Sequence, residues 1–272
     1  MINIKDKSLA SVVTFLSNVF YNPGTNPTGI MIFGGPAAGK GSHYEMINGM
    51  MTQPFQLAET GEFIRNEIAA GTPWGKVWQS TVERGDLVPD REIFKYVLPY
   101  IGYKIGSTGA PDGNRNTIFD GFPRTEWQAK FLVNAVDIFQ TELCTKIDMQ
   151  VLYLNISRDI ALDRSRGRIV DYTQQNKKIR ADDRDIETVK HRLDIFEENR
   201  DKILNVLSKH FTVNTVDTNR TWLFLQNGKY VIDQKIYAER EMQLAHMLEK
   251  SCADKFQDDI KTVLMLEKMY AA

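Results

Sequence analysis

A glycine-rich segment near the start of the chain has the residue types and the spacing of a phosphate-binding loop. Gly34, four further residues, Gly39 and Lys40 follow the apolar run 30–33, and residues 43–51 are compatible with a helix. In a strand, loop and helix arranged this way, backbone N–H groups and the positive end of the helix surround an oligophosphate, while the lysine reaches its outer phosphates. A plain glycine-rich turn is the alternative, but the flanking strand and helix favour an anion site.

An acidic residue ends a short apolar stretch further along the chain. Residues 117–119 are Thr-Ile-Phe, and Asp120 follows them. In a protein that also has a phosphate loop, a carboxylate at the carboxyl end of a buried strand is placed to hold Mg²⁺ directly or through water. Ser42, the first hydroxyl after Lys40, is the other oxygen donor expected for this ion. The alternative is that Asp120 only forms a cap or a turn before Gly121.

Arginines gather in the second half of the chain. The candidates for phosphate binding among them are Arg164, Arg166, Arg168, Arg180 and Arg192. A guanidinium group binds phosphate oxygens in pairs, which an ammonium group does not. The set therefore suits a reaction that brings several phosphates together, although each arginine alone could equally belong to a solvated helix face.

Five short apolar stretches are candidates for the strands that position these residues. They are residues 30–33, 55–58, 117–119, 149–154 and 211–216. Helix-compatible segments separate them, and this alternation predicts an α/β fold with a five-stranded parallel sheet flanked by helices on both faces. Ligands of such a sheet bind at the carboxyl ends of its strands, where the glycine-rich loop and Asp120 are expected.

The segments between the strands carry several helix signals. Thr60 is expected to cap a helix. Another helix is expected over residues 74–83 and a third from Pro89-Asp90 to about Tyr100, after which the polar, glycine-rich residues 102–116 are expected to form a surface loop. Later helices are expected over residues 125–140, from Ser157 to about Arg168, and over residues 186–209.

Both ends of the chain extend beyond this alternation. One helical face of residues 1–28 is apolar, which predicts an amphipathic helix packed on the domain. Lysines before that face leave organelle targeting as the alternative, although no small-x-small cleavage site is clear. Residues 221–272 are expected to form two helices, 232–251 and 254–270, which either cover the core or contact another subunit.

The composition excludes several classes of protein. The 272 residues carry a formal net charge of −1, so nothing favours broad attraction to nucleic acid or to a membrane surface. Cys144 and Cys252 lie far apart, which argues against a disulfide framework and against a structural zinc site. No apolar run approaches the roughly 20 residues that span a bilayer. A reducing, cytoplasmic compartment is therefore expected.

Three further clusters narrow the chemistry. They are Thr60–Arg65, Asp120–Thr125 followed by Gln128, and the arginines Arg164, Arg168, Arg180 and Arg192. Together with the loop they resemble the adenylate kinase family in order and spacing, from Ile30 to about Asp217. In nucleoside monophosphate kinases, too, a glycine stands between the loop lysine and the first hydroxyl, as Gly41 does here.

The resemblance implies a P-loop NTPase-type fold in three parts. The kinase core would span residues 29–220, an NMP-binding helical insertion residues 59–88, and a lid residues 168–180. The lid segment is short and lacks cysteines, so it resembles the small-lid form without zinc. The helical extensions 1–28 and 221–272 lie outside the resemblance.

The reaction that the resemblance implies is reversible phosphoryl transfer from Mg-ATP to AMP, giving two ADP, by a monomer. The family's pattern implies that ATP is bound by Gly35, Pro36, Ala37, Ala38, Gly39, Lys40, Gly41, Ser42, Arg164 and Arg168, with Arg164 against the adenine. It places on AMP the residues Thr60, Gly61, Arg65, Leu87, Val88, Gly121, Phe122, Arg124 and Gln128. The implied catalytic residues are Lys40, Arg124, Arg168, Arg180, Arg192, Asp182 and Asp183, the two aspartates orienting the lid arginines.

The choice of acceptor depends on few residues. In the family, Thr60 and Gln128 face the base of AMP. Uridylate-cytidylate kinases resemble this chain elsewhere but have Ser-Ala-Gly in place of Thr60-Gly61 and Asn in place of Thr125. The sequence therefore favours AMP, with another nucleoside monophosphate as the nearer alternative and a non-catalytic ATP-binding scaffold as the more distant one.

Two positions depart from the family's pattern. Ala37 stands where most members have glycine, and its Cβ would be unfavourable if the loop required a positive φ. His43 stands where the family usually has glutamine, and it is expected to be a helix residue near the phosphates, not an acid or a base. The acceptor phosphate is already an anion, so the reaction requires no general base.

Overall fold

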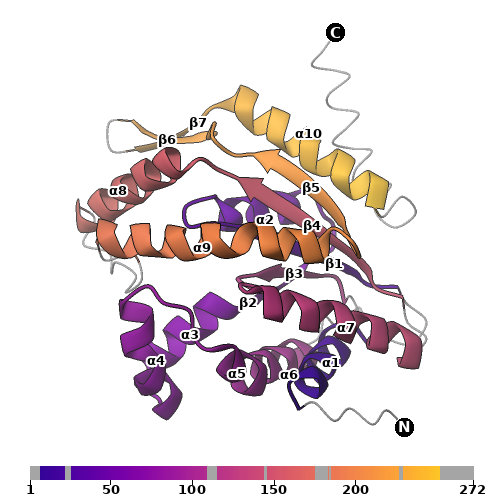
Figure 1. Ribbon diagram of the computed structural model, residues 1–272. Coiled ribbons are helices and arrows are strands. Elements are labelled where there is room, and N and C mark those ends of the chain that lie inside the picture. Colours follow the sequence, from indigo (N-terminus) through magenta and orange to yellow (C-terminus); the bar gives the residue numbers. More distant parts are fainter. Residues whose placement is uncertain are drawn as a thin grey trace.

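Figure 1 shows the protein as a computed structural model, which describes residues 7–21, 26–108, 115–143, 146–174, 183, 185–226 and 229–251. The central sheet has five parallel strands in the order β2-β3-β1-β4-β5. The strands are β1 (Thr28–Gly34), β2 (Gln56–Glu59), β3 (Thr117–Asp120), β4 (Asp148–Asn155) and β5 (Thr212–Asp217). The predicted α/β class and the five predicted strands are thus confirmed.

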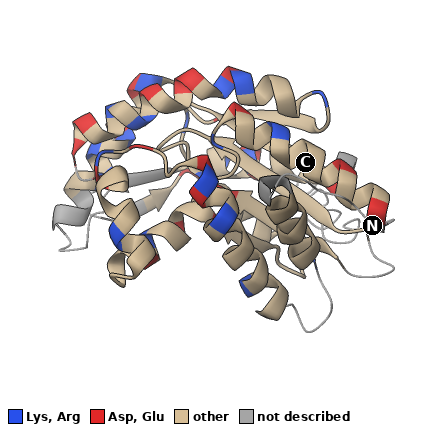
Figure 2. Ribbon diagram, turned by 60° about the horizontal axis from the view of Figure 1, so that its bottom comes forward, with Lys and Arg blue, Asp and Glu red and all other residues tan. Residues whose placement is uncertain are grey.

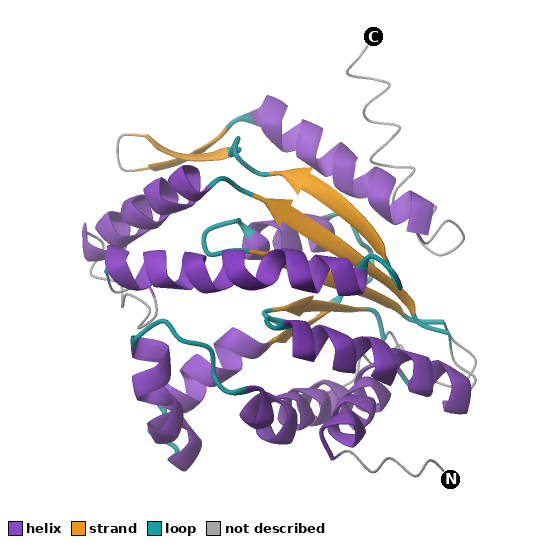
Figure 3. Ribbon diagram, in the orientation of Figure 1, coloured by secondary structure: helices purple, strands orange, loops and turns teal. Residues whose placement is uncertain are grey.

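Eleven helical segments are present in the described part of the chain, and several of their bounds differ from the predicted ones. They are α1 (Lys7–Phe20), α2 (Lys40–Gly49), α3 (Thr60–Ala69), α4 (Pro73–Glu83), α5 (Asp90–Glu92), the π-helix η1 (Ile93–Val97), α6 (Leu98–Thr108), α7 (Glu126–Leu143), α8 (Arg158–Gln174), α9 (Ile186–Leu207) and α10 (Gln234–Ser251). In Figure 3 the helices lie on both sides of the strands. Figure 2 shows acidic and basic residues interspersed along the helices, in line with the near-zero net charge.

The strand register brings the functional ends of the strands together. Ile32 of β1 and Glu59 of β2 both pair with Asp120 of β3, and Gly34 pairs with Leu154 of β4. Because all the strands are parallel, their carboxyl ends meet at one edge of the sheet. The glycine-rich loop and Asp120 therefore share that edge, as the sequence predicts.

Two apolar clusters fill the space on the two faces of the sheet. One packs α1, α6, α7 and α9 against β1 and β3, and includes Phe15, Phe119 and Ile203. The other packs α2 and α10 against β1 and β4, and includes Ile47 and Leu244. Both faces of β1 and β4 are buried, which explains why these strands read as continuous apolar runs.

Helix α1 packs on the domain as an amphipathic helix, between α6 and α7. The expected surface loop 102–116 is wrong over residues 102–108, which belong to α6. A Cβ on Gly102 would lie 3.2 Å from Cα of Phe15, and one on Gly106 would lie 3.0 Å from the carbonyl oxygen of Asn18. These glycines are therefore sites of close helix packing, and the tertiary contact overrides their weak helix propensity.

Two further predictions about helix ends are wrong. The N-cap of α3 is Glu59, and the Thr60 hydroxyl donates instead to the carbonyl of Gly121, 2.7 Å away. Helix α8 continues to Gln174, so residues 170–174 are helical where a polar lid segment was expected. Residues 175–180 of the predicted lid lie outside the described residues.

The C-terminal region contains a hairpin that the sequence did not reveal. Strands β6 (Leu223–Gln226) and β7 (Lys229–Ile232) pair antiparallel between β5 and α10. Helix α10 buries Leu244 and Leu248 against α2, so this helix covers the core. The second expected helix, 254–270, and both cysteines lie outside the described residues.

Candidate functional site

The glycine-rich loop wraps around the side chain of its own lysine. Lys40 begins α2, and its Nζ donates to the carbonyls of Gly34 and Gly35, each 3.2 Å away. Burial lowers the pKa of Lys40, an effect that the carboxylate of Asp120 opposes. The lysine is thus held inside the loop, next to the acidic end of β3, where it can meet a phosphate.

Two residues of the loop have left-handed backbones. Gly39 has φ 90°, and Ala37 has φ 59°. A side chain in this conformation costs about 1–2 kcal/mol. The loop therefore does require a positive φ at position 37, so the alanine that departs from the family's pattern is strained.

Asp120 lies partly buried at the carboxyl end of β3. Burial raises the pKa of its carboxyl group, and the positive charge of Lys40 opposes this rise. Among the described residues there is no group of three or more His, Cys, Asp or Glu side chains that could hold a metal. A carboxylate and the Ser42 hydroxyl are hard oxygen donors, and they suit Mg²⁺, which keeps water and phosphate oxygens as its other ligands.

A cluster of polar side chains lies across the cavity from the loop. Arg65 forms an ion pair with Glu59 at 2.7 Å, and Nε of Arg124 donates to the carbonyl of Gly121 at 2.8 Å. A Cβ on Gly61 would lie 2.9 Å from Nη1 of Arg65 and 3.2 Å from Nη2 of Arg124. The absence of a side chain at Gly61 therefore lets the two guanidinium groups approach each other.

Asp90 is a site residue that the sequence analysis missed. Its carboxylate accepts from Nε2 of Gln128 at 2.6 Å and from the hydroxyl of Thr125 at 3.0 Å. The carbonyl oxygen of the same glutamine accepts from the backbone N–H of Arg124 at 2.7 Å. A carboxylate only accepts and a backbone N–H only donates, so these bonds fix which end of the amide is which. Asp90 was considered only as a helix start, and no local pattern links it to Gln128.

A second carboxylate holds two of the predicted catalytic arginines. Asp183 is buried, and it accepts from Nη1 of Arg168 at 2.9 Å and from Nη1 of Arg192. Arg180 and Asp182 lie outside the described residues. Arg166 pairs with the exposed Asp163 and stays on a solvated helix face.

Arg164 reaches the loop from α8. Its Nη2 donates to the carbonyl of Thr218 at 2.5 Å and its Nη1 to that of Ala37 at 3.4 Å. His43 lies nearby on α2, where its Nδ1 is 2.8 Å from the carbonyl oxygen of Gly39. Burial lowers the pKa of His43 to about 4, so the ring is neutral near pH 7.

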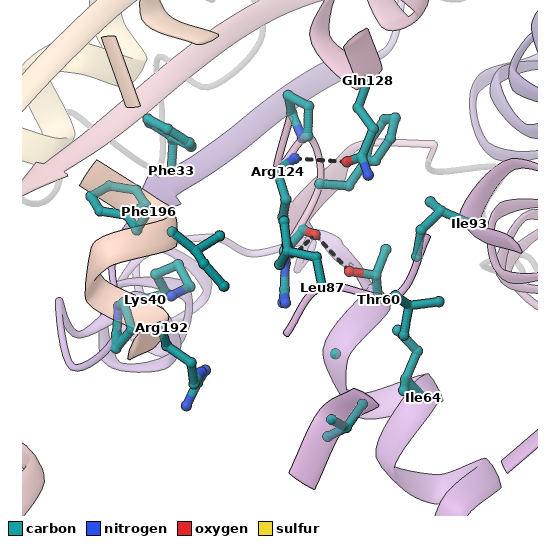
Figure 4. Close-up of a pocket in the computed structure, with 18 of the residues that line it drawn as sticks. Phe33, Lys40, Thr60, Ile64, Leu87, Ile93, Arg124, Gln128, Arg192 and Phe196 are labelled. Carbon is teal, nitrogen blue, oxygen red and sulfur yellow. Dashed lines mark hydrogen bonds between the residues drawn. The ribbon is translucent and has the colours of Figure 1, made fainter. Parts of the chain in front are cut away.

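Figure 4 shows the cavity that these elements enclose. Lys40 and Arg192 lie on one side of it, and Thr60, Arg124 and Gln128 lie on the other. The predicted residues that line it are Pro36, Lys40, Thr60, Gly61, Arg65, Leu87, Val88, Gly121, Phe122, Arg124, Gln128 and Arg192. Apolar side chains such as Phe33, Ile64 and Phe196 complete the wall, which suits a flat base beside a charged group.

Known proteins are similar to this chain over most of its sheet and helices. Residues 32–212 match the family model described as adenylate kinase. The adenylate kinase of Parabacteroides distasonis is 31% identical over 167 residues, covering 61% of this chain and 77% of that protein. Those of Clostridium kluyveri and Lawsonia intracellularis are 28% and 27% identical, cover 69% and 75% of this chain, and are themselves covered over 89% and 92%. Among the described residues, no helix is long and apolar enough to span a membrane.

Proposed function

The chain belongs to the adenylate kinase family and is a phosphotransferase that converts ATP and AMP into two ADP; we propose that it does so in the cavity of Figure 4. The observation that supports this site is the placement of Lys40 and Arg192 opposite Arg124 and Gln128 around one cavity. A donor phosphate on the loop side and an acceptor phosphate on the arginine side would meet between them.

On the donor side, the loop residues Gly35–Ser42 would surround the phosphates of ATP, and all of them except Pro36 have a backbone N–H group to donate. Lys40 would exchange its two carbonyl partners for phosphate oxygens. Arg164, which already contacts the carbonyls of Ala37 and Thr218, would lie beside the adenine. The loop and Arg164 would thus fix the two ends of the nucleotide.

Ser42 and Asp120 would hold Mg²⁺, in part through water. The ion would neutralise charge on the outer phosphates of ATP. Asp120 lies beside Lys40, so the carboxylate and the lysine would act on the same phosphate group from two directions.

On the acceptor side, Arg65 and Arg124 would bind the phosphate of AMP. Each now has an oxygen partner, Glu59 for Arg65 and the Gly121 carbonyl for Arg124, which keeps the guanidinium groups at the cavity before the phosphate arrives. Thr60 and Gln128 would face the base. Beyond its bonds to Asp90 and Arg124, the amide of Gln128 keeps one N–H and one lone pair on its carbonyl oxygen. The N–H can donate to the acceptor on the edge of adenine, and the carbonyl oxygen can accept from the donor on that edge.

Arg168 and Arg192, positioned by Asp183, would stabilise the charge of the phosphoryl group during transfer. Arg180 and Asp182 would join them from the lid. Closure of the insertion 59–88 and of the lid 168–180 would exclude water, which could otherwise accept the phosphoryl group. A monomeric state and a cytoplasmic location stay predictions.

The Arg124→Ala variant tests the assignment of the acceptor side. It should raise the KM for AMP by about 10- to 100-fold, the loss of a charge-assisted hydrogen bond, while the affinity for ATP stays nearly unchanged. Steady-state kinetics with each substrate varied in turn would measure both. Equal loss for ATP and AMP would contradict the assignment.

The choice of acceptor is tested by a coupled assay with AMP, CMP, UMP and GMP in parallel, with the Lys40→Ala variant as the blank. Fast ADP formation with AMP alone supports the assignment of Thr60 and Gln128. Preference for a pyrimidine nucleotide would keep the mechanism but reject these two residues as readers of adenine.

A further inference from the structure

Helix α10 carries a buried arginine that the proposed reaction does not use. Arg240 is 5% exposed and lies beyond residues 32–212, the part of the chain that matches the family model. Its Nη2 donates to the carbonyl of Asp217, but its Nε and Nη1 have no hydrogen-bond partner in the part of the chain that the structure describes. Buried cationic donors without partners are unfavourable, so these two donor nitrogens need an acceptor.

His43 on α2 offers the complementary group. The carbonyl oxygen of Gly39 can only accept, so the Nδ1 that lies 2.8 Å from it carries the hydrogen. In the neutral ring, Nε2 is then an acceptor. This Nε2 is buried too, and no described residue donates to it.

One aromatic ring brings the two side chains together. The ring of His43 meets the ring of Trp222 edge-on, with centroids 5.0 Å apart, and Cζ of Arg240 lies 6.0 Å from the centroid of the same ring. Trp222 is buried, and its carbonyl accepts from the backbone N–H of Asp233 at 2.8 Å, which ties it to the end of the β6–β7 hairpin. Arg240, which has two donor nitrogens without partners, and His43, which has one acceptor without a partner, therefore both pack on the indole of Trp222.

We propose that Arg240 donates to Nε2 of His43 through one buried water, and so holds the Gly39 carbonyl and the phosphate loop in the geometry that binds ATP. Arg240 is then a positioning residue for the donor nucleotide. The hairpin and α10 become parts of the ATP site, although neither touches the cavity. This inference rests on the proposed role of the loop in binding ATP.

The route from α10 to the phosphates has three links. Arg240 fixes the ring of His43, the ring fixes the carbonyl of Gly39, and Gly39 has the left-handed backbone from which α2 begins. Rotation of that carbonyl would turn the following N–H groups, which are those that face the phosphates. Loss of Arg240 should thus weaken ATP binding more than AMP binding, because Gly39, His43 and Arg240 are not among the described residues that line the cavity holding Arg124 and Gln128.

The test is calorimetric binding of Mg-ATP, together with steady-state kinetics, for Arg240→Met, Arg240→Lys, His43→Leu and the double variant His43→Leu/Arg240→Met. The matched control is Arg220→Met, the same chemical change at an arginine of the same region that forms an exposed ion pair with Glu239. Binding of Mg-ATP does not depend on turnover of any acceptor. A failure of the proposed reaction would therefore not be mistaken for a failure of this inference.

We expect Arg240→Met to raise the Kd of Mg-ATP by about five- to tenfold, as for one lost hydrogen bond, with the KM for AMP within twofold of the parent. Arg240→Lys should recover part of the loss, the double variant should be no weaker than His43→Leu, and Arg220→Met should match the parent. Unchanged ATP affinity in folded Arg240→Met, equal loss for both nucleotides, or additive effects of the two substitutions would overturn the proposal. If Arg240→Met does not fold, Arg240→Lys with undiminished ATP affinity would overturn it as well.

Discussion

Ala37 stores strain in the phosphate loop. Its φ of 59° lies in the left-handed region, which glycine adopts without cost. The carbonyl of the same residue accepts from Arg164, so the loop and α8 hold this backbone in place. Substitution of Ala37 is therefore expected to remove this backbone strain.

Replacing this alanine by glycine should stabilise the protein. The Ala37→Gly variant removes the strained Cβ contact but adds flexibility to the unfolded chain, so we expect a net gain of about 0.5–1 kcal/mol in the free energy of unfolding. Urea unfolding would measure it. The control is Ala38→Gly, at the adjacent buried position whose φ is not positive, which should lose stability. Loss of stability in both variants would show that position 37 is not strained.

Asp90 orients the side-chain amide of Gln128, which is proposed to bind the base of the acceptor nucleotide. The Asp90→Ala variant removes one of the two partners that keep the amide of Gln128 in one orientation. We expect the KM for AMP to rise about 10-fold or more, as for a lost hydrogen bond to a charged group, and the preference for AMP over the other monophosphates to fall. The four-acceptor assay would measure both.

The matched control for this variant is Arg91→Ala, which changes the exposed neighbour of Asp90. It should leave the acceptor preference unchanged. If Asp90→Ala raises the KM for every acceptor by the same factor, Asp90 supports the fold of the insertion and does not select the base.

The sequence predicts the residues of the loop and the arginines because their chemistry is local and their spacing is fixed. Asp90 and Arg240 were missed for the opposite reason. Each acts through a side chain far along the chain, Gln128 and His43, and hydrogen bonds between distant segments leave no local pattern. Sequence reasoning therefore finds groups that face the phosphates more readily than groups that position them.

At the scale of elements, the contact between α1 and α6 depends on glycine. Gly102 lies against the backbone of Phe15, and the ring of Phe15 meets that of Phe119 in β3 with centroids 5.7 Å apart. A side chain at Gly102 would therefore push α1 away from the sheet. The same glycine was the reason for expecting a loop, which shows how a packing role can look like a turn in the sequence.

The Gly102→Ala variant should destabilise the protein. Its Cβ would lie 3.0 Å from Cδ2 of Phe15 and 3.2 Å from Cα of Phe15, and overpacking of this kind costs about 1–3 kcal/mol. Gly49→Ala is the control, because a Cβ there meets nothing within 4 Å and a helical alanine is worth about 0.5–1 kcal/mol over glycine. Thermal unfolding should show opposite shifts. Shifts of the same sign would mean that the close approach of α1 and α6 leaves room for a side chain at position 102.

Most of the sheet was predictable because each strand is a short apolar run between helix signals. The β6–β7 hairpin was not, since its eight strand residues alternate poorly and the flanking residues were absorbed into a predicted helix. The π-helix η1, which joins α5 to α6, has no sequence signal of its own. These differences leave the strand order and the site unchanged.

At the scale of the whole molecule, a hydrogen bond links the predicted acceptor insertion, residues 59–88, to α9. Asp86, just beyond α4, lies 2.7 Å from Nε2 of His191, and it also accepts from Arg84 at 2.8 Å. The hydrogen bond from His191, followed by that from Arg84, lowers the pKa of Asp86. A carboxyl group with a lowered pKa stabilises the fold above its ordinary pKa, and this contribution is lost as the pH falls through the lowered value.

The Asp86→Asn variant should therefore be less stable than the parent near pH 6, and the difference should disappear as the pH falls below about 3, under the ordinary carboxyl range. Thermal unfolding of both proteins between pH 2 and pH 7 would measure it. A constant difference across this range would mean that Asp86 stabilises the fold by packing and not by its charge.

Helix α10 also sets the order in which the chain can fold. It is the last described element, yet it completes the apolar cluster beneath α2, which follows the first strand of the sheet. Because chains leave the ribosome from the N-terminus, α2 stays partly uncovered during most of synthesis. The acceptor half of the protein, built from residues 56–143, can be complete by then. On the role proposed for Arg240, a newly made chain would reach its full affinity for ATP only after α10 has been made.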